Sequence, residues 1–118
     1  MLADDPSHPV PSIDNLDMVA ARRGGGAHLV IMVAGALQAD ERSQRRLLAK
    51  LNTYADFVNS DAFRQEFGPL EASNVTVDVK IDAGSDPEIF DLLARCEPSA
   101  RESNINLTIN SALILAPQ

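Results

Sequence analysis

The most constraining feature of this sequence is an apolar stripe of helical period within residues 40–59. Its members recur at the spacings that place side chains on one face of a helix, and they are Leu47, Leu48, Leu51, Tyr54, Ala55 and Val58. Such a stripe is typical of an amphipathic helix that buries one side. Asp40 and Glu41 put negative charge in the first turn, which the helix dipole favours. The stripe therefore predicts a long helix over residues 40–59, against which the shorter elements pack.

Four shorter segments have the residue pattern of β-strands. Strict alternation of valine or isoleucine with polar residues predicts a strand over residues 74–82, with one buried and one wet face. Residues 105–115 alternate in a similar way and predict the last strand. A mixed run at residues 16–21 and an apolar run at residues 28–33 predict two more strands. The glycine-rich residues 22–26 between these two runs are typical of a hairpin turn.

Two further helices are predicted from their capping residues. Residues 61–67 follow Ser60, whose hydroxyl suits an N-cap, and they predict a short helix. A second main helix begins after Ser85 or Asp86, with a proline acceptable in its first turn. Pro98 is expected to end or kink this helix, since proline lacks a backbone N–H. For residues 98–104 a further turn of helix and a loop both remain open.

These elements define the fold class α/β, in the order β-β-α-β-α-β. Right-handed crossovers with both main helices on one face predict a two-layer sandwich on a mixed four-stranded sheet of order 1-2-3-4, with the first strand antiparallel to the rest. The strand at residues 28–33 is apolar at consecutive positions, so it is expected to be covered on both faces, by residues 10–16 or by a second subunit. Residues 1–12 hold three prolines and are interpreted as a flexible N-terminal arm, and residues 13–118 as a single α/β domain.

Charge and composition argue against several classes of partner. The 118 residues carry a net charge of −7, all of it in residues 51–118, because residues 1–50 hold six acidic and six basic side chains. An acidic protein repels phosphate backbones, so nucleic-acid binding is not expected. No apolar run approaches the ~20 residues of a membrane helix, and residues 1–12 lack the pattern of a signal peptide. Cys96 is the single cysteine, so no intramolecular disulfide can form, and a cytoplasmic location is predicted.

Arg42, Arg46 and Lys50 form the first candidate site. Their spacing of four residues places them on one face of the predicted long helix. This basic strip is interpreted as the outer face of the helix and as a docking face for an acidic partner or an anion. The alternative is a solvated face, on which Glu41 and Arg45 form an i,i+4 ion pair worth ~0.3–0.5 kcal/mol.

Asp82, Asp86 and Glu88 form the second candidate site. They follow the strand at residues 74–82, and the loop after a parallel strand is where α/β sheets place ligands. Carboxylates in such a loop suit a divalent cation or a small molecule, although the ligand set of an EF-hand is missing. The alternative is that these residues cap the next helix and contribute to an acidic surface.

The remaining chemically distinctive residues form no convergent set. Asn52 and Tyr54 are polar groups at the edge of a pocket, or else Tyr54 is a core residue with its hydroxyl at the boundary and Asn52 is a surface residue. His8, His28 and Cys96 are too few and too scattered for a structural zinc site, which needs about four ligands. No nucleophile and base can be paired from the sequence, so neither a cofactor nor a catalytic residue is predicted.

Three segments of the chain resemble a small family of uncharacterised, stand-alone bacterial proteins. They read IDNLDMVAARRGGGAHLVIMVAG, KLNTYADFVNSDAF and NVTVDVKID. The resemblance covers about residues 13–109, and its markers are Leu51 and Asn52 with Tyr54 and Phe57. It implies a hairpin, a long helix, a strand, a second helix and a last strand. It implies no chemistry, because the family is a domain of unknown function.

These observations favour a small, non-enzymatic protein that acts by binding another protein. Small size, an acidic second half and the lack of a catalytic set are compatible with an inhibitor-like or immunity-like role toward a basic partner. The alternative is a small-molecule or metal-ion binding protein that uses the loops after the second and third strands. A homodimer is compatible with both, through the strand at residues 28–33 or through the apolar Leu113 and Leu115 near the C-terminus.

Overall fold

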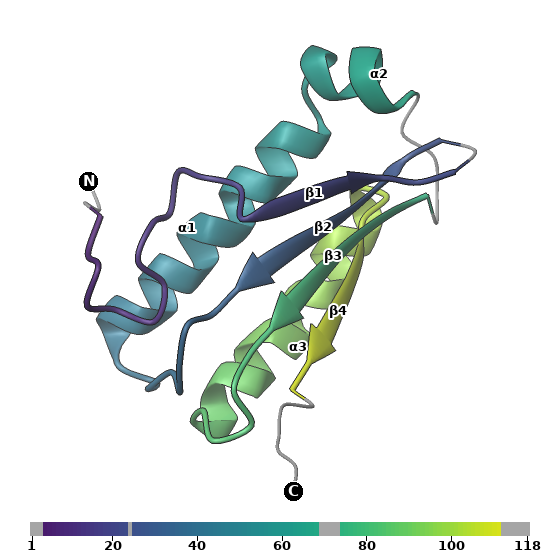
Figure 1. Ribbon diagram of the computed structural model, residues 1–118. Coiled ribbons are helices and arrows are strands. Elements are labelled where there is room, and N and C mark those ends of the chain that lie inside the picture. The colour runs from purple at the N-terminus through teal and green to yellow at the C-terminus, as the bar shows by residue number, and fades with distance from the viewer. Residues whose placement is uncertain (1–3, 24, 69–73, 112–118) are drawn as a thin grey trace, which may run out of the picture.

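The computed structural model describes residues 4–23, 25–68 and 74–111 of the chain, and it confirms the predicted order of strands and helices (Figure 1). The elements are β1 (Met18–Ala21), β2 (Ala27–Met32), α1 (Glu41–Val58), α2 (Asp61–Phe67), β3 (Val75–Lys80), α3 (Pro87–Glu102) and β4 (Asn106–Asn110). The part of the last predicted strand beyond residue 111 lies outside the described residues.

The four strands form one mixed sheet of order β1-β2-β3-β4. β1 is antiparallel to β2, with Met18 opposite Val30, and the other two pairs are parallel. The main helices α1 and α3 lie on the same side of this sheet, behind the strands in the view of Figure 1. The predicted two-layer α/β sandwich and its strand order are therefore confirmed.

Each helix begins at a side chain that accepts a backbone N–H of the first turn. Asp40 accepts from the amide of Ser43 at 2.7 Å, and Ser60 accepts from the amide of Phe63 at 3.1 Å. Asp86 begins α3, where its carboxylate accepts from an amide of the first turn at 2.9 Å. Since these amides have no partner inside the helix, the caps define where each helix starts.

α3 continues through Pro98 and ends at Glu102, so of the two alternatives left open for residues 98–104 the further turn of helix is the one found, and Pro98 does not end the helix. Proline removes the hydrogen bond to the carbonyl four residues earlier, that of Ala94. Both residues lie on the exposed side of α3, where water can bind the freed carbonyl. Ser103 is the C-cap of the helix, and it is followed by Asn104 with a φ of +63°.

The core lies between the sheet and the two main helices and consists mostly of aliphatic side chains. On β2 the helix-facing Ala27, Leu29 and Ile31 are fully buried. On the opposite face Val30 is buried as well, but Met32 is 48% exposed and His28 is exposed. The predicted cover on both faces is therefore wrong except at Val30, which lies in register between side chains of β1 and β3.

Residues 5–17, here called the N-terminal strap, follow the side of α1 before the chain enters β1 (Figure 1). Val10 and Ile13 of the strap are buried in the hydrophobic core. Over residues 5–12 the predicted flexible arm is thus a packed segment. The strap also differs from the expectation that residues 10–16 cross the second face of the sheet. Most of its side-chain contacts are with α1, and it meets the end of β2 where Pro9 and Asp17 accept the amides of Ala34 and Met32.

Candidate functional site

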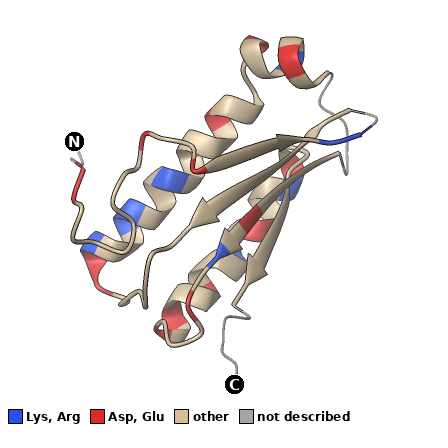
Figure 2. Cartoon of the chain, viewed as in Figure 1, with Lys and Arg blue, Asp and Glu red and all other residues tan. Residues whose placement is uncertain are grey.

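The predicted basic strip lies on α1 beside the strap (Figure 2). Arg46 is 1% exposed, and its guanidinium donates to the carbonyl oxygens of Val10 at 2.8 Å and Pro11 at 3.0 Å. Arg42 at the outer end is exposed and forms an ion pair with Asp5. These contacts hold the first half of the strap against α1.

Lys50 is 2% exposed and holds the second half of the strap. Its ammonium group donates to the carbonyl oxygens of Ser12 at 2.7 Å and Asn15 at 2.8 Å, and it pairs with the carboxylate of Asp17 at 3.0 Å. The prediction of an exposed docking strip is therefore wrong for Arg46 and Lys50. The physical reason is that the chain's own strap, with an acidic residue near each end, occupies that face of α1.

Tyr54 links the strap to the sheet. Its hydroxyl donates to the carbonyl oxygen of Val30 at 2.5 Å and accepts the amide of Asp17 at 2.7 Å. Burial raises the pKa of Tyr54 to about 12. The expectation that Tyr54 is a core residue is confirmed, since it is 1% exposed.

His8 and Ser43 lie together where the strap meets the start of α1, but they do not form a base and nucleophile. The amide of Val10 donates to His8 Nδ1 at 2.9 Å, so the ring proton is placed on Nε2. His8 Nε2 lies 3.0 Å from Ser43 Oγ and is then the donor in this pair. A histidine that already donates to a hydroxyl cannot remove its proton, so this contact fixes the strap.

The second predicted site lies near a hollow of about 240 Å³ at the carboxyl ends of β2, β3 and β4. Asp82 lines this hollow, whereas Asp86 and Glu88 do not. The carboxylate of Asp82 accepts the amide of Gly84 at 2.6 Å, and that of Asp86 caps α3. Among the described residues no three histidine, cysteine or acidic side chains are grouped to hold a metal ion. Helix capping, the alternative reading, accounts for the position of Asp86.

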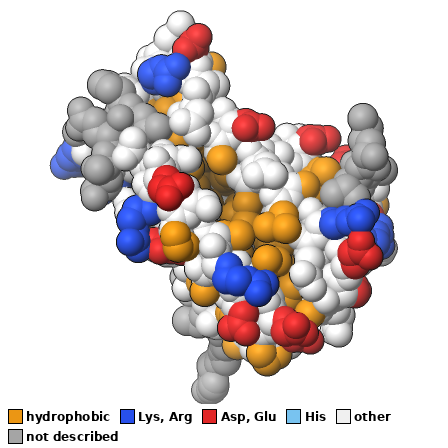
Figure 3. Space-filling view, turned by 180° about the vertical axis from the view of Figure 1, so that it is seen from behind, with side chains coloured by type: hydrophobic (Ala, Val, Ile, Leu, Met, Phe, Trp, Pro, Cys, Tyr) orange, Lys and Arg blue, Asp and Glu red, His pale blue; other side chains and the backbone are white. Residues whose placement is uncertain are grey.

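A third place, which the sequence did not indicate as a site, is a groove between α1 and α3. Figure 3 views the helical side of the molecule and shows hydrophobic side chains gathered in a hollow near its centre. The groove has a volume of about 320 Å³ and is lined by Leu48, Leu51, Asn52, Tyr54, Ala55, Val77, Arg95, Cys96, Ser99, Ala100, Ser103, Ile105 and Leu107. The side chains come from both helices and from the sheet beneath them.

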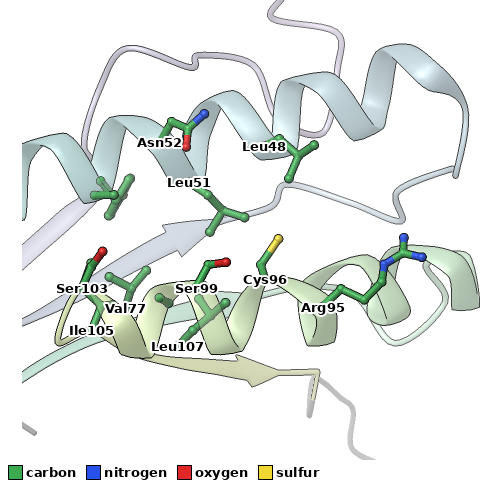
Figure 4. Close-up of a pocket in the computed structure, with 13 residues that line it drawn as sticks. Leu48, Leu51, Asn52, Val77, Arg95, Cys96, Ser99, Ser103, Ile105 and Leu107 are labelled. Carbon is green, nitrogen blue, oxygen red and sulfur yellow. The ribbon is translucent and has the colours of Figure 1, made fainter.

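The walls of the groove face one another across the gap between the helices (Figure 4). Leu48 and Leu51 extend from α1, and the thiol of Cys96 points toward them from α3. Burial raises the pKa of the Cys96 thiol, which is therefore protonated at neutral pH. A protonated thiol is a weak nucleophile and contributes an apolar, polarisable surface.

Polar side chains of both helices lie among the residues that line the groove. Arg95 and Ser99 belong to α3, and Asn52 belongs to α1. Within the described part of the chain, these three side chains make no hydrogen bond or ion pair. Their polar atoms can therefore bind a molecule that enters the groove. Asn52 is exposed, as its surface reading expects, and it also lies among the residues that line the groove.

The groove exists because α3 turns small side chains toward α1. Cys96, Ser99, Ala100 and Ser103 are separated by three, four and seven positions, which is the spacing of one helix face. Larger side chains there would fill the gap to Leu51 and complete the core. This stripe of small residues opposite a leucine-rich helix is the sequence signal from which the groove could have been predicted.

Comparisons of the chain with family models, with curated proteins and with solved structures found no match. The resemblance to uncharacterised bacterial proteins stays a prediction. None of the helices among the described residues has the length and hydrophobicity to cross a membrane.

Proposed function

We propose that the protein is a non-enzymatic binding protein that takes up a small, largely apolar molecule in the groove between α1 and α3. The observation that supports this most directly is the groove itself, with a volume of about 320 Å³ and a mainly aliphatic lining. Ligand pockets in proteins occupy roughly 300–1,000 Å³ and combine apolar walls with a few polar groups. The proposal thus retains the sequence-based alternative of a small-molecule binding protein. It places the binding site in the groove and not in the loops after the second and third strands.

Two features of the lining favour binding over chemistry. The raised pKa of Cys96 keeps its thiol neutral, and the hydroxyl of Tyr54 is already bound to Val30 and Asp17. The gain from filling the groove is hydrophobic, at about 0.8 kcal/mol for each buried methylene. The hypothesis of a protein partner stays a prediction. Arg46 and Lys50 are buried, so they are not available as contact residues for such a partner.

The proposal is tested by titration with N-phenyl-1-naphthylamine, a neutral dye whose fluorescence rises in apolar surroundings. We expect saturable binding by the natural protein and at least roughly tenfold weaker binding by Cys96→Trp, whose indole ring would occupy the gap. Ala94→Trp is the matched control, because Ala94 is exposed on the same helix and does not line the groove. Ala100→Leu is a second variant that fills the groove, with a smaller side chain than tryptophan. Circular dichroism checks that each variant is folded.

Cys96 also provides an internal reporter, since it is the single cysteine and lines the groove. The bound dye is expected to slow the reaction of Cys96 with a thiol reagent. Equal dye binding by Cys96→Trp, Ala100→Leu and the natural protein, with unchanged thiol reactivity, would show that the dye binds elsewhere and would overturn the proposal. Native mass spectrometry of the purified protein distinguishes a bound small molecule from a bound polypeptide.

A further inference from the structure

We infer that the molecule held in the groove is an amphipathic carboxylate, with an apolar chain between the helices and a carboxylate bound by Arg95. This inference rests on the proposed function and names the class of its ligand. It is based on the position of Arg95, on the groups around it and on the charge of the whole molecule.

Arg95 lies at the end of the groove nearer the N-termini of α1 and α3, beyond Cys96 (Figure 4). It is exposed, and it forms no ion pair with the described residues, although Asp91 precedes it by one helical turn. The other exposed arginines on the helices are paired with a carboxylate. Arg42 pairs with Asp5 of the strap, and Arg45, Arg64 and Arg101 pair with Glu41, Asp61 and Glu97 of their own helices. Arg95 therefore keeps its hydrogen-bond donors available at the groove.

A carboxylate fits this position better than a neutral polar group. The planar guanidinium presents paired N–H donors that match the two oxygens of a carboxylate. Ser99 lies one turn further along α3 and offers a hydroxyl on the same side of the helix. The apolar walls lower the local dielectric constant, so an ion pair formed at the end of the groove is stronger than one in open water.

The remainder of such a ligand matches the rest of the lining. From Arg95 the groove continues past Cys96 and Leu51 toward Ile105 and Leu107. These side chains offer apolar surface to an aliphatic chain, with the hydroxyls of Ser99 and Ser103 beside it. A ligand with a carboxylate at one end and a hydrocarbon chain can therefore bind Arg95 with the carboxylate and the apolar lining with the chain.

The negative net charge of the protein allows a test that separates the effect of Arg95 from the charge of the whole molecule. With a net charge of −7, the molecule as a whole repels anions. A preference for an anionic ligand over its neutral analogue therefore requires a local positive group. We compare octanoate with 1-octanol as competitors for bound N-phenyl-1-naphthylamine, because the two molecules share their chain length and differ in the head group.

In the natural protein we expect octanoate to displace the dye at a concentration roughly two- to fivefold lower than 1-octanol does. Arg95→Gln is expected to remove this difference while 1-octanol displaces the dye as before. Arg101→Gln is the matched control, because it removes one positive charge from the same helix outside the groove. It should leave the preference for octanoate intact.

The possible results separate the two proposals. If 1-octanol displaces the dye as well as octanoate does, the groove binds apolar molecules but the inference of a carboxylate is wrong. If octanoate is preferred equally by the natural protein and Arg95→Gln, the carboxylate is bound elsewhere and Arg95 has no such role. If the dye itself fails to bind the folded protein, the proposed function fails, and the inference fails with it.

Discussion

The ammonium group of Lys50 has lost almost all contact with water, and each of its three protons has an oxygen acceptor. Two acceptors are main-chain carbonyls, and the third is the carboxylate of Asp17. Removing a charged group from water costs several kcal/mol, which short charge-assisted hydrogen bonds can offset. At the scale of single residues, Lys50 is therefore a structural residue whose positive charge fixes the course of the strap.

We expect Lys50→Met to lower the free energy of unfolding by about 2–4 kcal/mol, because methionine keeps the apolar stem but leaves three acceptors without their donor. Urea unfolding followed by circular dichroism measures this change. Arg45→Met is the control, since Arg45 is exposed on the same helix and its ion pair with Glu41 should contribute at most ~0.5 kcal/mol. Equal losses in the two variants would contradict the structural role of Lys50.

Gly26 illustrates a different constraint, that of the backbone. It has a φ of +83°, and a Cβ at this position would lie 1.9 Å from the carbonyl oxygen of Asn74. We expect Gly26→Ala to lower the free energy of unfolding by about 2 kcal/mol or more, because the backbone has to shift. Gly35→Ala is the matched control, since its Cβ would meet no atom within 4 Å. Similar unfolding midpoints for both variants in urea would contradict this account of the hairpin.

At the scale of elements, the strap and α1 form one unit. Contacts between them extend from Arg42, paired with Asp5, to Thr53, whose hydroxyl donates to the carbonyl of Ile13 at 2.6 Å. His8 anchors the first part of this unit through its neutral ring. Protonation of Nδ1 would replace the acceptor for the amide of Val10 by a second donor and would break that contact.

The strap should therefore become less stable as the pH falls. Burial, and then Arg46 and Arg42, lower the pKa of His8, while Asp5 and Asp40 oppose this shift. The unfolded chain, with a histidine pKa of about 6.5, takes up the proton first, so the stabilisation is complete above that pH. It is lost as the pH falls from about 6.5 toward the lowered pKa of the folded protein.

We expect the free energy of unfolding to decrease between about pH 7 and pH 5.5, and we expect a flatter profile for His8→Asn. Asparagine can accept the amide two residues later without binding a proton. The lowered pKa values of Asp5 and Asp40 place their titration at more acidic pH, outside this window. Urea titrations at several pH values test the prediction, and an equal slope in the variant would assign the pH dependence to other groups.

For the molecule as a whole, the parts that were predictable from the sequence depend on local signals. The alternation in β3 and the caps Ser60 and Asp86 act within a few residues, so this strand and these helix starts followed from them, and the strand order followed from the right-handed crossovers. Arg46 and Lys50 are buried by the strap, which lies some 36 positions earlier in the chain. No periodicity records such a contact, so the spacing alone predicts an exposed strip even though Arg46 and Lys50 are buried.

The groove was missed for a related physical reason. Leu48 and Leu51 fit the apolar stripe of α1 whether the opposite wall is filled or empty. What decides between the two is the size of the side chains on α3, where Cys96 and Ala100 are too small to reach across. A pattern of hydrophobic and polar residues predicts which face of a helix is buried. The volume of the side chains on the neighbouring helix determines whether that face is in contact with it or borders a groove.

The order of the sheet, in which neighbouring strands are also consecutive in the chain, bears on how the protein is made. A ribosome releases the chain from its N-terminus, and domains of a growing polypeptide begin to fold in that direction. β1 and β2 can close as a hairpin, β3 then joins the free edge of β2, and β4 joins that of β3. No finished pair of strands has to reopen for a later one. The strap is the exception, because it is synthesised before α1 and can pack only after that helix has formed.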